Sequence, residues 1–511
     1  MKKLIVLTFL ILQVSAYPSK AQETLVLTLD RAINIALSKS YTVKSYQEKK
    51  LAMQHSFRYW EAMFKPRMDF SLFAPSWTEN VRPIQRVDGL PVYNSIGSMQ
   101  YSGNLKFTYT LPTGGNLALN SMLYRDNLKT VLALQDYETL RSRKAQSSFS
   151  LSFDQPILTK NQLKESLEEA RLQYEKMSNE FSRRQLDIIY QVTESFYAVY
   201  RATREVEIAG EKLKNSEEAY RIAKLKGEAG RIPEGDMLIA EVAAAQNRAA
   251  LSESDGKLER AKDALKQLIG LELYDLIQIE TDLRYDTFKI DQDGAIEKAL
   301  RHRLEVYESE LDIKLQEIGL DRAERIRELS GKISAYYDVT GVSTVEHGST
   351  ADLFRSSFNN FVDRPPNRGV TLTLSYPIFD WGRGRERVQR EMASLREAQL
   401  SLEDIKTTII REVRDIVRSV EETMNRLIIH EKNQQLAQKS YEISRMRFEN
   451  GNITSQELGT EQERLAATQL DYLNAYITYQ LANADLKRKT LWDFKNNSSY
   501  LVEEEYFQTK E

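Results

Sequence analysis

The segment that says most about the architecture reads TLTLSYPIFDWGRGRERV and covers residues 371–388. Its first part alternates polar and apolar residues with a period of two, which is typical of a strand with one apolar face. Pro377 and Ile378 close this run, and after Gly382 the chain contains no further proline, which favours a long helix. The segment therefore predicts a transition from an amphipathic strand to a long helix.

The same transition occurs earlier in the chain. The segment FSLSFDQPI, residues 149–157, also alternates and ends at Pro156 and Ile157. Pro377 follows Pro156 by 221 positions (377 − 156 = 221), and Gly451 follows Gly230 by the same distance. The shared register indicates a tandem duplication, in which each half has the order helix, strand, strand, long helix, tight turn and returning helix.

These patterns predict the boundaries of each part. A positive start followed by an apolar run predicts a signal peptide over residues 1–21, with cleavage between Ala21 and Gln22. The first repeat, 22–270, contains a helix, strands 66–76 and 147–157, an extra hairpin 101–125, a long helix 159–228, a tip, and a helix 233–270. After a linker, 271–293, the second repeat, 294–492, contains a helix, strands 332–342 and 369–379, a long helix 383–449, a tip, and a helix 453–492; residues 493–511 form a C-terminal tail.

The extra hairpin has no counterpart in the second half. Its turn is predicted at Pro112-Thr113-Gly114-Gly115. The hairpin fits three positions: beside the wall of a barrel, as a cap outside it, or against the helices. The resemblance of its turn to the Pro-Ile strand ends favours the first.

The composition excludes several classes of protein. A charged fraction of 28% and a mean hydropathy of −0.51 exclude a bundle of transmembrane helices, because each would need about 20 consecutive apolar residues. A net charge of −3 gives no excess of positive charge that would favour binding to nucleic acid, which argues against a nucleic-acid-binding protein. The absence of cysteine excludes disulfides, thiolate metal sites and a lipid-modified N-terminal cysteine.

No pattern of residues predicts an enzyme. The four histidines are scattered without metal-ligand spacing, and neither a phosphate-binding loop nor a Gly-x-Ser-x-Gly elbow occurs. We therefore expect no catalytic residues, no metal site and no cofactor.

The strands of one chain cannot form a closed barrel. The smallest membrane-spanning barrels have eight strands, and an open sheet edge is not tolerated in lipid. We therefore expect the strands to close with copies from other subunits. Four strands from each of three chains would give about 12, or about 18 if the extra hairpin joins the wall.

Together these features resemble the TolC family of outer-membrane efflux channels. The resemblance rests on the duplication, on the strand-to-helix transitions, and on two similar tips; these segments are Pro377-Ile378-Phe379-Asp380-Trp381-Gly382, Gln155-Pro156-Ile157-Leu158, residues 230–236 and residues 451–457. It implies an α+β membrane protein with trimeric TolC-like architecture, in which an outer-membrane β-barrel is continued by a long periplasmic α-helical barrel. It also implies a passive exit duct of a tripartite efflux or type I secretion system. The expected partners are a periplasmic adaptor protein, an inner-membrane transporter and outer-membrane lipid.

The same resemblance implies roles for particular residues. The residues expected to contact the adaptor are those of the tips: Gly230, Arg231, Ile232, Gly451, Asn452, Ile453 and Thr454. The candidates for a periplasmic constriction are Asp236, Glu457 and Glu461, and the strand-to-helix transitions comprise Pro156, Ile157, Pro377, Ile378 and Gly382. Where the family commonly has a second acidic residue after Glu457, this chain has Thr460.

Two alternatives stay open from the sequence. Asp236 and Glu457 are also explained as first-turn carboxylates favoured by a helix N-terminus. The coiled-coil hairpins would also suit a periplasmic adaptor or scaffold that bridges the two membranes without a pore of its own. Within the duct hypothesis, the pattern fits small-molecule efflux and protein secretion equally.

Overall fold

The computed structural model describes residues 24–280, 285–343, 348–450 and 452–500. The chain divides into two compact units. One, here called the sheet unit, comprises residues 51–176 and 310–400. The other, the helical unit, comprises the described residues up to 50, residues 177–309, and those from 401 on.

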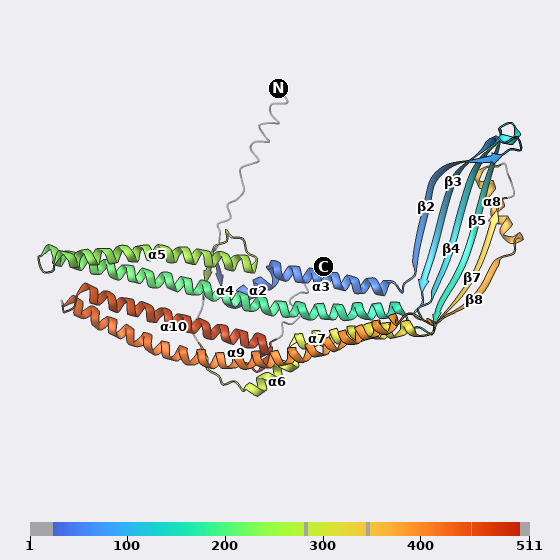
Figure 1. Ribbon diagram of the computed structural model, residues 1–511. Helices are drawn as coiled ribbons and strands as arrows, with labels where there is room; N and C mark the ends of the chain where they lie inside the picture. Colours follow the sequence, from blue (N-terminus) through green and yellow to red (C-terminus); the bar gives the residue numbers. More distant parts are fainter. Residues whose placement is uncertain (1–23, 281–284, 344–347, 451, 501–511) are drawn as a thin grey trace, which may run out of the picture. The chain divides into compact units, whose positions relative to one another are not determined.

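The sheet unit contains one antiparallel sheet of six strands in chain order (Figure 1). The strands are β2 (Arg67–Gln85), β3 (Pro91–Thr110), β4 (Asn116–Leu132), β5 (Glu138–Ile157), β7 (Ser330–Val342) and β8 (Asn367–Ser375). Within the described residues, β2 and β8 each have one paired neighbour, so both are open edges.

The two faces of this sheet differ in polarity. One row across the strands joins Phe107, Leu119, Leu151 and Tyr337, whereas the next row on the opposite face joins Asn120, Ser150 and Asp338. On the apolar face of β2, Phe70 and Leu72 are 69% and 74% exposed. Such exposure of large apolar side chains on one face is typical of a sheet that faces lipid.

The extra hairpin lies within the sheet. Its strands β3 and β4 pair continuously between β2 and β5, which places the hairpin in the wall and excludes a separate cap. The predicted bounds 101–125 and 66–76 were too short, because β3 begins at Pro91, β4 ends at Leu132, and β2 continues to Gln85 after an irregularity between Phe73 and Ser76. The apolar alternation fades along these strands while their hydrogen-bonded ladders continue, so periodicity alone underestimated their length.

One helix of the sheet unit was not predicted. Helix α8 (Thr350–Asp363) connects β7 to β8 and begins with a capping box formed by Ser349 and Asp352. Leu353 and Ser357 are its buried residues.

The helices of the two repeats correspond in order. They are α2 (Leu29–Lys39), α3 (Tyr41–Ala62), α4 (Gln162–Glu228) and α5 (Glu234–Ile269), followed by α6 (Gln292–His302), α7 (Leu304–Glu324), α9 (Arg383–Glu449) and α10 (Ser455–Thr490). The single helix expected at the start of each repeat is therefore broken in two. The breaks occur at Ser40 and Arg303, which are 263 positions apart (303 − 40 = 263), as are the buried Ala32 and Ala295 (295 − 32 = 263).

Two short strand pairs lie in the helical unit. Strand β1 (Leu25–Leu27) pairs in parallel with β6 (Ile277–Ile279), which lies in the predicted linker. Strands β9 (Trp492–Asp493) and β10 (Ser498–Ser499) form a small hairpin at the start of the predicted tail.

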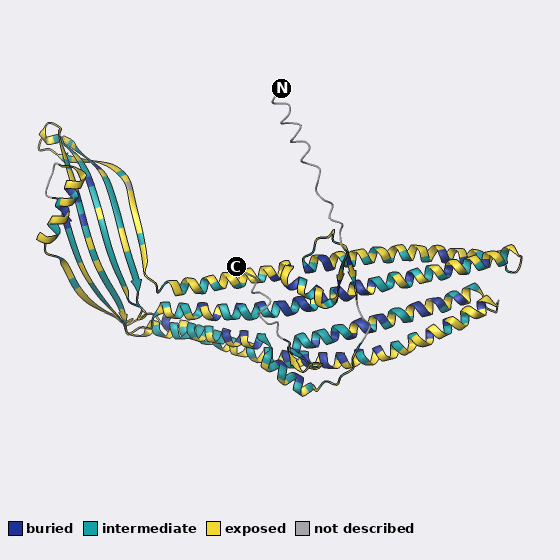
Figure 2. Cartoon of the chain, turned by 180° about the vertical axis from the view of Figure 1, so that it is seen from behind, coloured by how far each residue is buried: buried dark blue, intermediate teal, exposed yellow. Residues whose placement is uncertain are grey.

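The core of the helical unit lies along the inner sides of its helices. Figure 2 shows buried residues following these sides, whereas the sheet is mostly half-buried or exposed. One cluster contains Tyr476 and Tyr479, each 1% exposed, and a second contains the fully buried Phe196. None of the helices in the described ranges has a long enough apolar stretch to cross a membrane.

Candidate channel gate and docking tips

The turns that end the two long helices share one backbone hydrogen bond. In the first hairpin the Arg231 N–H donates to the Lys226 carbonyl at 2.8 Å, and in the second the Asn452 N–H donates to the Arg447 carbonyl at 2.8 Å. A bond from the residue after a left-handed position back to the last turn is the Schellman motif. Gly230 occupies that position with φ +69°, while its counterpart Gly451 lies outside the described residues.

The returning helix α10 begins with a capping box. The Thr454 side chain accepts a hydrogen bond from the Glu457 N–H at 3.2 Å, and Glu457 Oε2 accepts one from the Thr454 N–H at 2.8 Å. The hydrogen bonds from the Thr454 backbone and hydroxyl lower the pKa of Glu457. This carboxylate is therefore held at the helix N-terminus.

The other two acidic candidates have different surroundings. Asp236 lies in the first turn of α5, which starts after Pro233 without a side-chain cap. Glu461 accepts a hydrogen bond from the Ser440 hydroxyl at 3.0 Å and forms an ion pair with Arg464 at 2.6 Å. The charge of Glu461 is thus countered within its own hairpin.

The remaining tip residues differ in exposure. Arg231, Asn452 and Thr454 are exposed, whereas Ile232 and Ile453 are half-buried. Ile453 packs against the apolar cluster near the second tip, so the exposed polar groups are the accessible part of each turn.

The two hairpins are joined by contacts that the sequence did not predict. Lys212 of α4 forms an ion pair with Glu463 of α10 at 2.7 Å, and the Gln462 amide donates to the Lys212 carbonyl at 3.0 Å. Lys226 lies 5.0 Å from the centre of the Phe448 ring. An apolar cluster between α4, α9 and α10 contains Ala219, Ile222, Ala437, Tyr441, Phe448, Leu458 and Leu465.

The strand-to-helix transition of the first repeat is tied to the extra hairpin. Pro156 and Ile157 end β5, and Asn161 Oδ1 accepts hydrogen bonds from the first N–H groups of α4, at 3.0 Å for Leu163. The Asn161 amide also donates to the carbonyl of Pro112, in the turn of the extra hairpin, at 3.1 Å. The hairpin turn therefore braces the start of the long helix.

The second transition uses a carboxylate. After Pro377 and Ile378, Asp380 accepts hydrogen bonds from the N–H groups of Gly382 at 3.0 Å and Gly384 at 2.7 Å. The hydrogen bond from Gly384 is the main reason why the pKa of Asp380 is lowered. Gly382 itself has φ +80°, a conformation that glycine adopts without strain.

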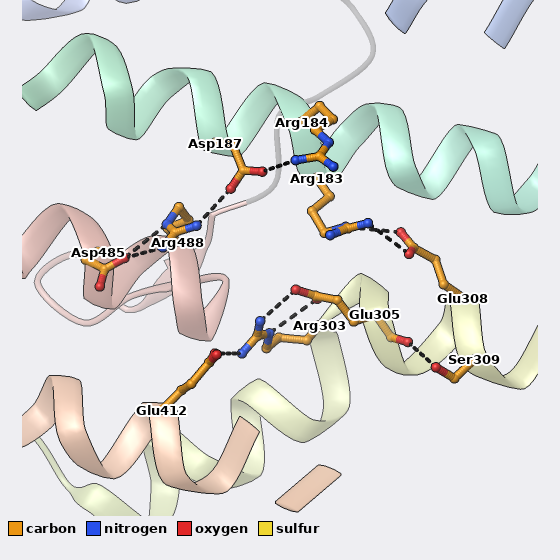
Figure 3. Close-up of polar contacts among 10 residues, drawn as sticks. All are labelled: Arg183, Arg184, Asp187, Arg303, Glu305, Glu308, Ser309, Glu412, Asp485 and Arg488. Atoms are coloured by element: carbon orange, nitrogen blue, oxygen red, sulfur yellow. Dashed lines mark hydrogen bonds and ion pairs between the residues drawn. The ribbon is translucent and has the colours of Figure 1, made fainter. Parts of the chain in front are cut away.

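A cluster of charged side chains lies in the helical unit where α4, α7, α9 and α10 meet (Figure 3). Arg303, at the break between α6 and α7, forms ion pairs with Glu305 and Glu412, both at 2.6 Å. Burial acts to raise the pKa of Glu305, but the hydrogen bond and charge of Arg303 outweigh it and lower the pKa.

Two further arginines of the cluster, Arg183 and Arg488, also form ion pairs with carboxylates. Burial raises the pKa of Glu308. The ion pair with Arg183, at 3.2 Å, lowers it but does not outweigh the effect of burial. Arg488 bridges Asp187 at 2.8 Å and Asp485 at 2.7 Å. Most members of the cluster line a small cavity of about 100 Å³, and the cluster joins helices of both repeats, which indicates a structural clamp.

The described residues contain no group of three or more His, Cys, Asp or Glu side chains placed to hold a metal ion. The predicted cleavage residues Ala21 and Gln22 lie outside the described ranges.

Comparisons with known proteins agree with this arrangement. The profile of the family described as outer membrane efflux protein matches residues 117–271 and 295–490, one segment in each repeat. Among curated proteins, none matched the sequence.

Solved structures with this fold are outer-membrane channels. The chain is similar to the Campylobacter jejuni CmeC outer membrane channel, with a TM-score of 0.66, 14% identity, and coverage of 90% of this chain and 85% of that one. It is similar to the outer membrane protein VceC of Vibrio cholerae, with a TM-score of 0.61, 14% identity, and coverage of 90% and 95%. It is also similar to the open state of the Neisseria gonorrhoeae MtrE outer membrane channel, with a TM-score of 0.63, 13% identity, and coverage of 90% and 88%.

The family match spans most of both repeats, and the fold is that of the TolC-like channels, as the sequence predicted. The family is one of channels and not of enzymes, and its members reside in the outer membrane with large periplasmic helical portions. The chain therefore belongs to the outer membrane efflux protein family and is an outer-membrane exit duct.

Proposed function

We propose that three copies of this chain close their sheets into one barrel of about 18 strands, six from each chain. The observation that carries this proposal is the sheet with one apolar face and two open edges, β2 and β8. Unpaired N–H and C=O groups at these edges would be costly in lipid, and pairing β2 of one copy with β8 of the next satisfies them.

Cysteine cross-linking tests this closure, and the chain supplies a clean background because it has no cysteine. Phe70→Cys in β2 is combined in turn with Val370→Cys, Leu372→Cys or Leu374→Cys in β8, all on the apolar face. One of these pairs should give a covalent trimer under oxidation.

The control exploits the alternation of faces. Thr373→Cys points to the polar face and should not cross-link to Phe70→Cys, because successive residues of a strand point to opposite sides. Efficient intramolecular closure, or a covalent dimer as the final product, would contradict a three-chain barrel.

We propose further that the helical hairpins form the periplasmic gate of the duct. The contacts of Lys212 and Lys226 with the second hairpin hold the two hairpins together, and Glu457 presents an exposed carboxylate just after the second tip. Three such carboxylates around an axis would attract cations and raise one another's pKa. Asp236 would supplement this charge, while Glu461, paired with Arg464, would contribute less.

The exposed polar groups of the tips suit contact with a partner protein. We assign Gly230, Arg231, Ile232, Gly451, Asn452, Ile453 and Thr454 as the docking region for a periplasmic adaptor, which would link the duct to an inner-membrane transporter. A photo-cross-linker placed at Asn452 should capture such a partner in cells, whereas one placed at the exposed Lys257 on α5 should not. Equal capture from both positions would refute docking at the tips.

The alternative of an adaptor without a pore is not favoured. It accounts for the hairpins but gives no reason for a six-stranded sheet whose apolar face is exposed.

A further inference from the structure

Helix α8 is seated on the apolar face of the sheet. Ser357 Oγ lies 2.8 Å from the Gly341 carbonyl oxygen and 2.9 Å from Ser147 Oγ. Gly341 and Ser147 are cross-strand partners, and they share their face with Phe149 and Val339, the partners two residues further along. The helix therefore covers the side of the sheet that faces lipid.

The strand residues beneath α8 are small. Ala145 and Ser147 are 0% and 1% exposed, and a Cβ on Gly341 would collide with the Ser357 carbonyl group. Large apolar residues occupy the corresponding positions closer to the helical end of the strands. The replacement of large by small residues at this level lets α8 pack directly on the strands.

An apolar groove of about 310 Å³ runs between α8 and the sheet. Its walls include Ser121, Leu123, Phe149, Val339, Phe358 and Phe361. On the helix, Phe358 is 51% exposed and Val362 is 88% exposed. Because the groove opens onto the apolar face of the sheet, a lipid acyl chain can enter it without leaving the membrane.

Four cations lie on the same face just beyond the groove. The register of β4 and β5 places Arg125 beside Ala145, Asn127 beside Arg143, and Lys129 beside Arg141. Arg125 donates to the Thr350 hydroxyl at the start of α8, while Lys129, Arg141 and Arg143 are exposed and have no carboxylate partner in the described part of the chain.

Aromatic side chains at the same level of the sheet are typical of the boundary between membrane and water. Tyr101 lies 6.0 Å from the Arg125 guanidinium, and Trp77 is 67% exposed in the row of Arg143. Tyrosine and tryptophan are enriched where a membrane meets water. Glu79, an acid in the same row as Lys129 and Arg141, accepts a hydrogen bond from Ser95 at 2.5 Å.

The length of the strands places these cations at headgroup level. From Ile157 to Ser147, β5 spans ten residues (157 − 147 = 10), or about 33 Å along the strand. At a tilt of about 40° this is about 25 Å, the height of the apolar band of an outer-membrane barrel. Because β5 leads into a periplasmic helix, the row of Arg143 belongs to the outer leaflet.

We propose that the groove beside α8 and the cations Arg125, Lys129, Arg141 and Arg143 form a binding site for a phosphate-bearing, acylated lipid of the outer leaflet. An acyl chain occupies the groove and the phosphate lies against the cations. This site depends on the outer-membrane location of the chain and is independent of the proposed trimer and gate.

Native mass spectrometry of the purified full-length protein, with bis-phosphorylated lipid A as the probe, tests the headgroup contacts. The triple variant Lys129→Gln, Arg141→Gln, Arg143→Gln should bind about a hundredfold more weakly, since each cation near an anionic headgroup contributes about fivefold. Lys144→Gln is the matched control, because Lys144 lies next to Arg143 but on the opposite face, and its affinity should stay within about twofold.

Three results would overturn the headgroup contacts. The first is an unchanged affinity in the triple variant, and the second is equal binding of dephosphorylated lipid A. The third is displacement of lipid A by inorganic phosphate at similar concentration, which would indicate a site for any phosphate ion and not for a lipid.

The groove is tested separately. Ser121→Phe fills it without altering a charge, and should reduce retention of lipid A while the melting temperature, which reports correct folding, is preserved. A photo-cross-linker at Phe358 in living cells should give a lipid adduct. Full retention by Ser121→Phe, or a protein adduct from position 358, would exclude an acyl chain as the occupant.

Discussion

Glu457 combines two roles that mutation can separate. Its carboxylate completes the capping box of α10 and is also the exposed charge proposed for the constriction. Glutamine also serves at this position of a capping box, so Glu457→Gln retains the cap and removes the charge. We expect this variant to keep its thermal stability and lose part of its cation preference in planar bilayers. Thr454→Ala should show the converse, with a loss of about 1 kcal/mol in the stability of the hairpin.

The lowered pKa of Glu457 gives the cap a pH dependence. A carboxyl whose pKa is lower in the folded state stabilises it above the unfolded pKa, and this contribution is lost as pH falls through the folded value. Amides in the first turn of α10 should therefore exchange hydrogen faster on acidification. The acceleration should be absent in Glu457→Gln, and a wild-type pH response in that variant would assign the effect to another group.

For single residues, the sequence predicted the position within a helix better than the side-chain partners. Glu457 and Asp236 could be placed in first turns because tips and helix starts have local patterns. The partners of Glu461 could not be predicted, because Ser440 approaches it from a different helix. Capping is local in sequence, whereas pairing depends on which helix faces lie together.

Among the elements, the contact between α4 and α10 is the clearest candidate for regulation. Lys212→Gln removes the ion pair with Glu463 while the backbone carbonyl still accepts from Gln462. If this contact holds the gate closed, mean conductance should rise with little change in stability, because an exposed ion pair contributes only about 0–1 kcal/mol. Lys257→Gln, which breaks a pair with Glu253 inside α5, is the matched control. Equal conductance in both variants would argue against a gate at Lys212.

The break between α6 and α7 depends on a buried guanidinium. Arg303→Met would leave Glu305 and Glu412 without their shared partner, and removing one member of a buried ion pair costs about 3–5 kcal/mol. Chemical denaturation should report this loss. Arg171→Met, which removes exposed pairs on α4, should cost less than about 1 kcal/mol, and similar values for the two variants would contradict a clamp.

The elements also differ in how well periodicity predicts them. The long helices α4 and α9 each have an apolar stripe along their length. Their predicted ends lie within a few residues of the ends in the structure. Helix α8 has a local signal that could have predicted it, because the Ser349 cap is followed by apolar residues at helical spacing; its packing on Ser147 and Gly341 could not be predicted, because those residues lie in distant parts of the chain. The breaks at Ser40 and Arg303 were missed because neither residue is a helix breaker by type; the chain bends there to follow the packing of the helical unit.

For the molecule as a whole, a passive duct makes a direct electrical prediction. Purified protein inserted into planar bilayers should give discrete, cation-biased conductance steps, because the polar face of the sheet and the carboxylates of the tips would line the path. Conductance should be low until the gate contacts are altered. Correctly inserted trimers that remain silent, even with Lys212 and Glu457 both replaced, would contradict the duct.

The fold class could be predicted from the sequence because the duplication supplied two copies of the strand-to-helix transition and of the tip. The 221-residue repeat (377 − 156 = 221) made weak strand patterns at Pro156 and Pro377 reinforce each other. The extra hairpin occurs once, so its position in the sheet required the pairing of β3 with β2 and of β4 with β5.

The ladder of β4 and β5 continues for eight residues beyond the last partner of β7, from Gln146 to Glu138 (146 − 138 = 8). At about 3.3 Å per residue, these strands extend about 26 Å past the end of β7, so that the ends of the strands would lie beyond the headgroup-level rows of Arg143 and Arg141. The adjoining turn between β2 and β3 contains Gly89, which has open space around it. A short epitope inserted there would be displayed to the medium, so that antibodies or dyes could count and track the channels on living cells without touching the wall or the gate.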